Sequence, residues 1–304
     1  MPDRQSSARL AAEIDEALSL LDEFRSTSSA APGDAPLPSL LDECRALCAA
    51  LPRPEPMRSL HHPACSGGTL ISKTVAALSG VVLLSEIDPL STMEVRSKPG
   101  FAPTDLLLGL RYATRHINDR TLVATFQGAI RAMHESLSLS GRRLVLRDHT
   151  HSHYFTNTNP DRPSVYEMLR DTLPVRSLVT VRHPLDCFIA LEANGWRHFD
   201  PFTLEEYCRR LKAFLDRHED LPLIRYEDFT SDPPTTLEQI CKALELPFNP
   251  LALDLLGLVR LSGDSGRSWH RIETRPRRDV PPTIEDQRVS ELYSETCQRL
   301  GYTP

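Results

Sequence analysis

Long apolar runs are absent from this 304-residue chain. No stretch of 18 consecutive apolar residues occurs, so the sequence predicts no membrane-spanning helix. The first residues, Met-Pro-Asp-Arg-Gln-Ser-Ser, lead into an acidic amphipathic segment and lack the apolar core of a secretory signal. The seven cysteines are odd in number, and their spacing is that of neither a zinc site nor a disulfide framework. Together these absences favour a protein of the reducing cytoplasm.

An excess of positive charge is also absent. The net charge of −6 argues against a general nucleic-acid binder, although it leaves room for local basic clusters. Hydrophobic residues make up 40% of the chain and charged residues 25%, which is ordinary for a globular protein. The length is sufficient for one catalytic domain with an appendage.

The first part of the chain has a helical pattern. Apolar residues recur at helical spacing in residues 8–25, and a linker rich in proline and small residues follows. A second short helix is predicted at about residues 39–51, before a proline-rich stretch. We therefore predict a helical extension over residues 1–56, in which the sequence indicates no chemistry.

From Met57 onward, predicted strands and helices alternate. The strands are expected at residues 58–62, 81–85, 143–147, 177–182 and 223–226. The helices are expected at about residues 68–79, 104–118, 121–139, 184–194, 203–219, 235–244 and 284–300. Strands joined by helical crossovers predict an α/β fold in residues 57–304, with a mostly parallel central sheet covered on both faces. Ligands of such sheets bind beyond the carboxyl ends of the strands.

A turn of small residues, Cys-Ser-Gly-Gly-Thr at positions 65–69, stands between the first predicted strand and the helix after it. Such a turn offers backbone N–H groups and partial positive charge to a phosphate. The obvious comparison is the triphosphate-binding loop G-x-x-x-x-G-K-[ST], whose end Lys73 and Thr74 fit. Ser72 replaces its second glycine, so this motif is broken. A phosphotransferase of that class remains the alternative.

The segment Ser-Gly-Gly-Thr-Leu at positions 66–70 resembles the loop by which sulfotransferases bind the 5′-phosphosulfate end of 3′-phosphoadenosine 5′-phosphosulfate (PAPS). Three further stretches resemble motifs of that family, in the family's order: the strand and turn at 177–186, Tyr-Glu-Asp at 226–228, and Ser-Gly-Asp-Ser-Gly-Arg at 262–267. The resemblance covers about residues 57–304. It implies a P-loop-like three-layer α/β/α fold.

The same resemblance implies an activity. A sulfuryl group would move from PAPS to a hydroxyl or amine of a small-molecule or carbohydrate acceptor, with adenosine 3′,5′-bisphosphate (PAP) as the second product. As in phosphoryl transfer, the protein would mainly position the reactants and stabilise spreading charge. Neither a nucleic acid nor a catalytic metal is implied.

Residue roles follow from the same resemblance. The 5′ end of the nucleotide would contact Cys65, Ser66, Gly67, Gly68, Thr69, Leu70 and Lys73. The 3′-phosphate would contact Arg182 and a C-terminal loop that contains Ser265, Gly266 and Arg267. Position 190 is Ala where the family normally has serine, so one hydroxyl contact is missing or comes from elsewhere. The Tyr-Glu-Asp stretch is expected to be structural.

Two residues compete for the role of general base. Arg-Asp-His at 147–149 resembles the Lys-Thr-His segment of cytosolic sulfotransferases, whose histidine is the base. Glu86 stands where protein-tyrosine sulfotransferases carry a catalytic glutamate. His149, His151 and His153 alternate and would share one face of an extended chain, but no fourth metal ligand accompanies them, so a metal site is the weaker hypothesis.

Cys65 is a departure from the family. Its position normally holds a lysine or arginine that bridges the leaving phosphate and the sulfuryl group. Lys73 and Arg147 are the two candidates for a substitute cation. Removing one such electrostatic contact typically slows turnover about 100- to 1,000-fold, so a non-catalytic or weakened nucleotide-binding member of the fold is a third hypothesis. Aromatic residues that could line an acceptor pocket are Tyr154, Trp196 and Phe199.

Overall fold

The computed structural model describes residues 55–93, 106–111, 113–261, 272–274 and 276–304, together with positions 16, 19, 20 and 23. The chain divides into two units, Met1–Arg53 and Pro54–Pro304. The predicted helical extension lies almost wholly outside the described residues, so it remains a prediction, as does its boundary at residue 56. The described strands all belong to the second unit.

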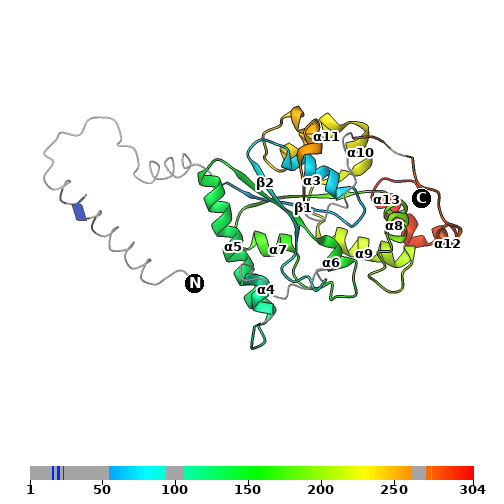
Figure 1. The fold of residues 1–304 in the computed structure, drawn as a ribbon, viewed down its shortest axis with the longest axis horizontal. Coiled ribbons are helices and arrows are strands. Elements are labelled where there is room, and N and C mark those ends of the chain that lie inside the picture. The colour runs from blue at the N-terminus through cyan, green and yellow to red at the C-terminus, as the bar shows by residue number, and fades with distance from the viewer. Residues whose placement is uncertain are drawn as a thin grey trace. The chain divides into compact units, whose positions relative to one another are not determined.

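A five-stranded parallel sheet forms the centre of the second unit (Figure 1). Its strands are β1 (Met57–His61), β2 (Val81–Ile87), β3 (Arg143–Asp148), β4 (Val175–Val181) and β5 (Leu223–Arg225), in the spatial order β2-β3-β1-β4-β5. All four pairings between neighbouring strands are parallel. The prediction of an α/β fold with a parallel sheet is therefore confirmed.

Helices cover both faces of this sheet (Figure 1). One face carries α3 (Gly68–Ala76), α10 (Tyr226–Ser231) and α11 (Pro233–Ala243). The other face carries α5 (Asp119–Leu139), α6 (Thr150–Tyr154), α7 (Val165–Arg170), α8 (Pro184–Ala193), α9 (Leu204–Arg217) and α13 (Glu291–Arg299). Side chains alternate along each strand, so Val145 packs with the first group of helices, while Leu144 and Leu146 pack with the second. The result is the expected three-layer arrangement.

The helix predictions were less complete than the strand predictions. The predicted helix at 284–300 is interrupted and consists of α12 (Pro282–Glu285), the 3₁₀ turn η3 (Asp286–Val289) and α13, which Ser290 caps. Of the predicted helix at 104–118, residues 106–111 form α4 (Leu106–Arg111), whereas the described residues 113–118 are not helical, so the prediction was wrong there. Short elements were missed: α6, α7, α10, η1 (Pro250–Leu253) and η2 (Leu256–Leu258). One or two turns are too short to show a 3.6-residue period. Among the described helices, none is long and apolar enough to span a membrane.

The carboxyl ends of the strands meet at one edge of the sheet, as parallel pairing requires. At or just beyond this edge lie the residues that carry the functional hypothesis: the glycine turn after β1, Glu86 near the end of β2, His149 after β3, Arg182 after β4, and Tyr226 after β5. The topology therefore brings together residues that are far apart in the sequence.

Candidate active site

The glycine turn offers backbone donors at the start of α3. Gly67 caps the helix in a left-handed conformation with φ +82°. The first backbone hydrogen bond at this end runs from Leu70 N–H to the Gly67 carbonyl, at 2.9 Å. The N–H groups of Gly67, Gly68 and Thr69 find no acceptor among the described residues. Three such donors, together with the positive end of the helix dipole, suit an anion.

Two aromatic rings explain why this turn needs two glycines. A Cβ atom on Gly67 would lie 2.1 Å from the ring of Tyr226, and one on Gly68 would lie 2.1 Å from the ring of His62. Neither ring could stay in place if either position carried a side chain. Ser66 supports the turn from inside, since it is buried and its hydroxyl donates to the Pro63 carbonyl at 2.8 Å.

Arg147, near the end of β3, joins the turn to the neighbouring strand. Its Nη2 donates to Thr69 Oγ1 at 3.0 Å, and its Nε donates to His62 Nε2 at 2.7 Å. Burial, reinforced by the charge of Arg147, lowers the pKa of His62 well below its ordinary value, so the ring is neutral and can accept this bond. Nη1 donates to Ser85 Oγ at 2.8 Å and forms an ion pair with Glu86.

An irregularity in β2 aims Glu86 at this arginine. The register with β3 shifts between Leu84 and Ile87, and Glu86 has a φ of +61°. A left-handed conformation costs a residue with a side chain about 1–2 kcal/mol, so the surrounding contacts must hold it there. With this backbone, the carboxylate contacts Arg147 through Oε1, while Oε2 lies 3.3 Å from His149 Nε2.

His149 follows β3 directly and caps the short helix α6. Its side chain is 25% exposed, and that of Glu86 is 24% exposed, so both are within reach of solvent. The two competing candidates for the base are therefore direct neighbours, and the arginine proposed as a substitute cation contacts the same carboxylate. Sequence positions 86, 147 and 149 form one cluster.

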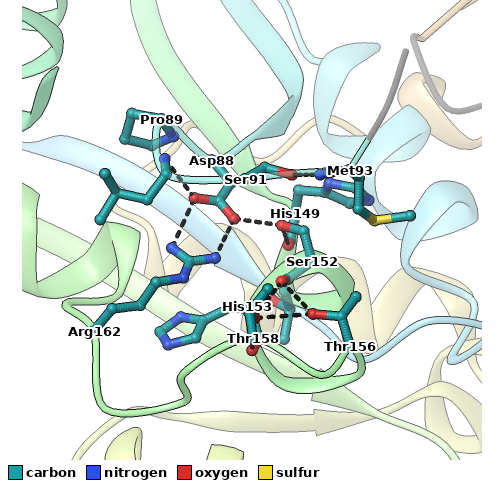
Figure 2. A network of polar contacts seen from close by, with 12 residues as sticks. Asp88, Pro89, Ser91, Met93, His149, Ser152, His153, Thr156, Thr158 and Arg162 are labelled. Atoms are coloured by element: carbon teal, nitrogen blue, oxygen red, sulfur yellow. Dashed lines mark hydrogen bonds and ion pairs between the residues drawn. The ribbon is translucent and has the colours of Figure 1, made fainter. Parts of the chain in front are cut away.

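The buried carboxylate of Asp88 connects the end of β2, where Glu86 lies, with α6, which follows His149 (Figure 2). Asp88 lies just beyond β2. Its two carboxylate oxygens accept hydrogen bonds from the two terminal nitrogens of Arg162, at 2.9 and 2.6 Å. The hydroxyl of Ser152 in α6 lies between Asp88 and the His149 carbonyl and is 2.9 Å from the latter. The network ties the segment after Glu86 to the helix that begins after His149.

Arg182 lies at the same edge, one strand away from the turn. Its guanidinium stacks over the ring of Tyr226, 5.0 Å from the centroid, and Tyr226 is also the ring that covers Gly67. Asp186 lies 4.0 Å from Arg182 Nη2 and accepts a hydrogen bond of 2.7 Å from Arg277 Nε. A second positively charged region thus stands next to the turn, with Tyr226 between the two.

The profile of the sulfotransferase family matches residues 64–250, which is more than half of the chain. This chain belongs to the sulfotransferase family. The match runs from the glycine turn to beyond α11, so it includes the turn, Glu86, His149 and Arg182.

Solved sulfotransferase structures resemble the chain at low identity. The sulfotransferase domain from the curacin biosynthetic pathway is 18% identical with a TM-score of 0.49, over 82% of this chain and 99% of that domain. The sulfotransferase domain of the Synechococcus PCC 7002 olefin synthase is 18% identical with a TM-score of 0.49, over 83% and 96%. Mouse sulfotransferase SULT7A1, crystallised with PAP, is 14% identical with a TM-score of 0.38, over 80% and 85%. No curated protein matches the chain.

Several residues that the sequence predicted for the site lie outside the cluster of Glu86, Arg147 and His149. Ser265, Gly266 and Arg267 lie outside the described residues, so their assignment remains a prediction. Leu70 packs in the apolar core, and Lys73 is buried in the sixth position of α3. Two of the aromatic candidates for the acceptor pocket, Tyr154 and Phe199, belong to the core, while Trp196 is partly buried at its border.

The three alternating histidines do not share one extended face. β3 ends at Asp148, and His151 and His153 lie in α6, where both are buried. Within the part of the chain that the structure describes, no group of three His, Cys, Asp or Glu residues is arranged to hold a metal. His151 contacts His198 with a nitrogen-to-nitrogen distance of 2.6 Å, and burial lowers the pKa of His151 to about 3.

Sequence reasoning missed the position of Tyr226 between Gly67 and Arg182. The Tyr-Glu-Asp stretch was expected to be structural, and Glu227 is, since it accepts hydrogen bonds from His183 N–H at 3.0 Å and Tyr302 Oη at 2.6 Å. The ring of Tyr226, however, covers Gly67, and the guanidinium of Arg182 stacks on the same ring. The signal in the sequence was Gly67, the first of two adjacent glycines, because adjacent glycines indicate that other groups approach the backbone closely.

Proposed function

We propose that this sulfotransferase moves a sulfuryl group from PAPS to a hydroxyl or amine of a small-molecule or carbohydrate acceptor and releases PAP. One observation carries the proposal. Three backbone donors at the start of α3, the cation Arg147 and the Glu86–His149 pair converge at the carboxyl edge of the sheet. Sulfuryl transfer needs these three elements: an anion site, a positive charge, and a proton acceptor.

The residues present fit the nucleotide's two phosphate groups. The N–H groups of Gly67, Gly68 and Thr69 would hold the 5′-phosphate, because each lacks an acceptor within the described part of the chain. Arg182 would hold the 3′-phosphate, with Arg267 as a further prediction from the sequence. Bound PAPS would supply an activated sulfuryl group whose leaving group is a phosphate. Tyr226 separates the two anion-binding regions and would fix the distance between them.

We assign the base to His149 and an orienting role to Glu86. Both carboxylate oxygens of Glu86 are engaged, one by Arg147 and the other by His149 Nε2. His149 meets Glu86 through Nε2, so Nδ1 is the nitrogen that would take the proton from the acceptor as its oxygen or nitrogen attacks sulfur. The two residues then act as a pair, in which the carboxylate orients the imidazole.

The test is a titration of the purified protein with PAP and, separately, with ATP and magnesium, followed by thermal denaturation. PAP at about 100 times its Kd should stabilise the folded state by about 2.7 kcal/mol. Arg182→Ala should weaken this effect, whereas Arg176→Ala, which removes an exposed arginine paired with Glu245, should not. If ATP with magnesium stabilised the protein and PAP did not, the result would contradict sulfuryl transfer and favour phosphoryl transfer.

A transfer assay completes the test. Labelled PAPS would be offered with panels of phenols, alcohols, amines and sugars, and labelled products would be separated. Transfer to a member of a panel supports the proposal and identifies the acceptor class. Binding of PAP without transfer to any panel, and without slow release of sulfate to water, would favour a nucleotide-binding protein that has lost the reaction.

A further inference from the structure

Residues 301–303, shortly after α13, lie against two turns at the carboxyl edge of the sheet. The ring of Tyr302 lies 5.0 Å from the ring of His183, the residue that follows Arg182. The guanidinium of Arg225, the last residue of β5, lies over the same tyrosine ring, 5.6 Å from its centroid. We call residues 301–303 the docked segment, because they contact the turns after both β4 and β5.

The carboxylate of Glu227 connects the docked segment with both turns. Its Oε1 accepts a hydrogen bond of 3.0 Å from the backbone N–H of His183, and its Oε2 accepts one of 2.6 Å from the hydroxyl of Tyr302. Burial and the charge of Glu227 raise the pKa of Tyr302, so the hydroxyl stays protonated and donates. Glu227 follows Tyr226 in the chain and His183 follows Arg182, so this carboxylate joins the positions next to both members of the Arg182–Tyr226 stack.

The ring of His183 provides a second connection to the docked segment. Its Nδ1 accepts from the backbone N–H of Leu185 at 3.3 Å, in the first turn of α8. The proton of the neutral ring is therefore on Nε2, which donates to the Thr303 carbonyl at 2.9 Å. Burial lowers the pKa of His183, and this keeps the ring in the neutral form that the two bonds require.

These bonds fix the backbone at the base of the Arg182 side chain. The guanidinium itself stacks on Tyr226 and lies 4.0 Å from Asp186, and both contacts act on the end of a long side chain. A side chain that is ordered before its ligand arrives loses less conformational entropy on binding. The affinity of Arg182 for an anion therefore depends on how firmly Glu227 holds the turn.

We propose that Glu227, held in place by Tyr302, is a positioning residue for the 3′-phosphate of the nucleotide. It fixes the Arg182 turn against Tyr226, so the guanidinium is in place before the phosphate arrives. This inference rests on the proposed function. Coupling between two sites is reciprocal, so a bound 3′-phosphate must also stabilise the contacts of the docked segment.

The experiment compares the binding of three nucleotides by calorimetry. The ratio of the affinities for PAP and adenosine 5′-monophosphate reports the 3′-phosphate, and the ratio for PAP and adenosine 3′-monophosphate reports the 5′-phosphate. Tyr302→Phe keeps the ring and removes only the donor to Glu227. It should lower the first ratio about three- to tenfold, which corresponds to one hydrogen bond, and leave the second ratio within about twofold. Glu227→Gln should lower the first ratio at least as much.

A double-mutant cycle separates positioning from general loosening. Arg182→Ala should remove most of the dependence on the 3′-phosphate. In that background Tyr302→Phe should have no further effect on the first ratio, because the group that it positions is gone. Tyr166→Phe, which removes a hydroxyl from α7, is the matched control and should leave both ratios unchanged. The melting temperature checks that each variant is folded, and Tyr302→Phe decides alone if Glu227→Gln is not.

Hydrogen exchange tests the reciprocal effect in the wild-type protein. The backbone N–H of Tyr302 donates to the Cys297 carbonyl at 2.8 Å, so its exchange reports opening of the docked segment. At saturating concentrations, PAP should slow this exchange more than adenosine 5′-monophosphate does. Equal exchange with the two nucleotides would contradict the coupling.

The outcomes distinguish the two proposals. A wild-type protein that does not bind PAP would overturn both the proposed function and this inference. If PAP binds and Arg182→Ala weakens it, a Tyr302→Phe variant with an unchanged first ratio would overturn only the inference. An equal fall of both ratios, or an undiminished effect in the Arg182→Ala background, would also overturn only the inference. If Arg182→Ala leaves the first ratio unchanged, the 3′-phosphate is held elsewhere, and the inference fails together with that assignment.

Discussion

The consecutive residues Arg147, Asp148 and His149, at the end of β3 and just after it, belong to two very different polar regions. Arg147 and His149 join the edge cluster with Glu86, where side chains reach solvent. Asp148 points to the opposite face of the sheet and accepts hydrogen bonds from His61 Nδ1 and Thr150 Oγ1, both at 2.9 Å. Strand alternation thus divides adjacent polar residues between a site and an interior.

The interior region is a continuous chain of hydrogen bonds across three strands. Ser177 contacts Ser59 at 2.5 Å between hydroxyl oxygens, and Ser59 contacts His61 Nε2 at 2.9 Å. His61 continues to Asp148, which leads to Thr150. None of these five residues is more than 4% exposed. We call this set the buried array.

The buried array has the residue types of a hydrolase triad, yet it cannot act as one. A substrate cannot reach its serine, and each hydroxyl is already paired inside the protein. The edge cluster and the glycine turn beside it have the opposite properties, since the backbone donors of the turn lack acceptors in the described chain and the side chain of His149 is 25% exposed. The difference teaches that exposure and unsatisfied donors indicate chemistry, whereas full internal pairing indicates structure.

The largest expected effect is on the edge cluster. His149→Ala should reduce sulfuryl transfer about 100- to 10,000-fold, the usual contribution of a general base, with little change in melting temperature. The rate of PAP release from PAPS in the presence of an accepted hydroxyl compound measures it. His116→Ala, at an exposed position of the described chain, is the control. A variant that keeps more than a tenth of the wild-type rate would remove His149 from the role of base.

Asp148→Asn, in the buried array, should lower the stability of the fold, whereas His149→Ala should lower the rate of transfer. Burial alone would raise the pKa of Asp148, but the hydrogen bond and charge interaction with His61, followed by His218 and the hydrogen bond from Thr150, outweigh it and hold the pKa below its ordinary value. Loss of this buried charge should cost about 3–5 kcal/mol of unfolding free energy, measured by urea denaturation. Asp216→Asn, which breaks a half-exposed pair with Arg299, should cost about 1 kcal/mol or less. Normal stability with lost transfer would contradict the division between the two regions.

Acid should weaken the interior next to this array. Burial, together with nearby His61, lowers the pKa of His218 to about 4. The unfolded chain binds a proton at this residue near pH 6.5, so between pH 6.5 and pH 4 the folded state binds fewer protons and stability falls as the pH falls. The loss at pH 4 is about 3 kcal/mol. Urea titrations at pH 7.5, 5.5 and 4.5 measure the slope.

His218→Gln provides the control for this pH effect. The variant cannot titrate at this position, so its stability should depend less steeply on pH over the same range. His151, whose pKa is also lowered, should still contribute to the remaining slope. Equal slopes in the variant and the wild type would show that the buried imidazole is not the cause.

The smallest expected effect lies at the end of the buried array. Ser177→Ala should cost about 1 kcal/mol, because Ser59 keeps its contact with His61. Combined with Asp148→Asn in a double-mutant cycle, it tests whether the array acts as a unit. A coupling above about 0.5 kcal/mol indicates one network, and strict additivity indicates independent bonds.

Much of the fold could be predicted because it has local signals. Runs of β-branched and leucine residues marked strands such as β2 and β4, and the observed ends of all five strands lie within two residues of the predicted ones. The turn at 65–69 and Arg182 were found because a strand end, a helix start and small residues occur together in the sequence. The short helices α6 and α10 were not found, since an alternation of histidines and a Tyr-Glu-Asp stretch resemble extended chain when only neighbours are considered.

The sequence by itself determined the alternation of strands and helices, the glycine turn and the candidate residues for each role. Only the tertiary structure decided that Glu86 and His149 are neighbours, that Arg147 reaches Thr69, and that Tyr226 covers Gly67. The order β2-β3-β1-β4-β5 produces these contacts, and so does the shift of register that turns Glu86 toward Arg147. Both depend on packing between segments tens of residues apart, which local backbone preferences do not encode.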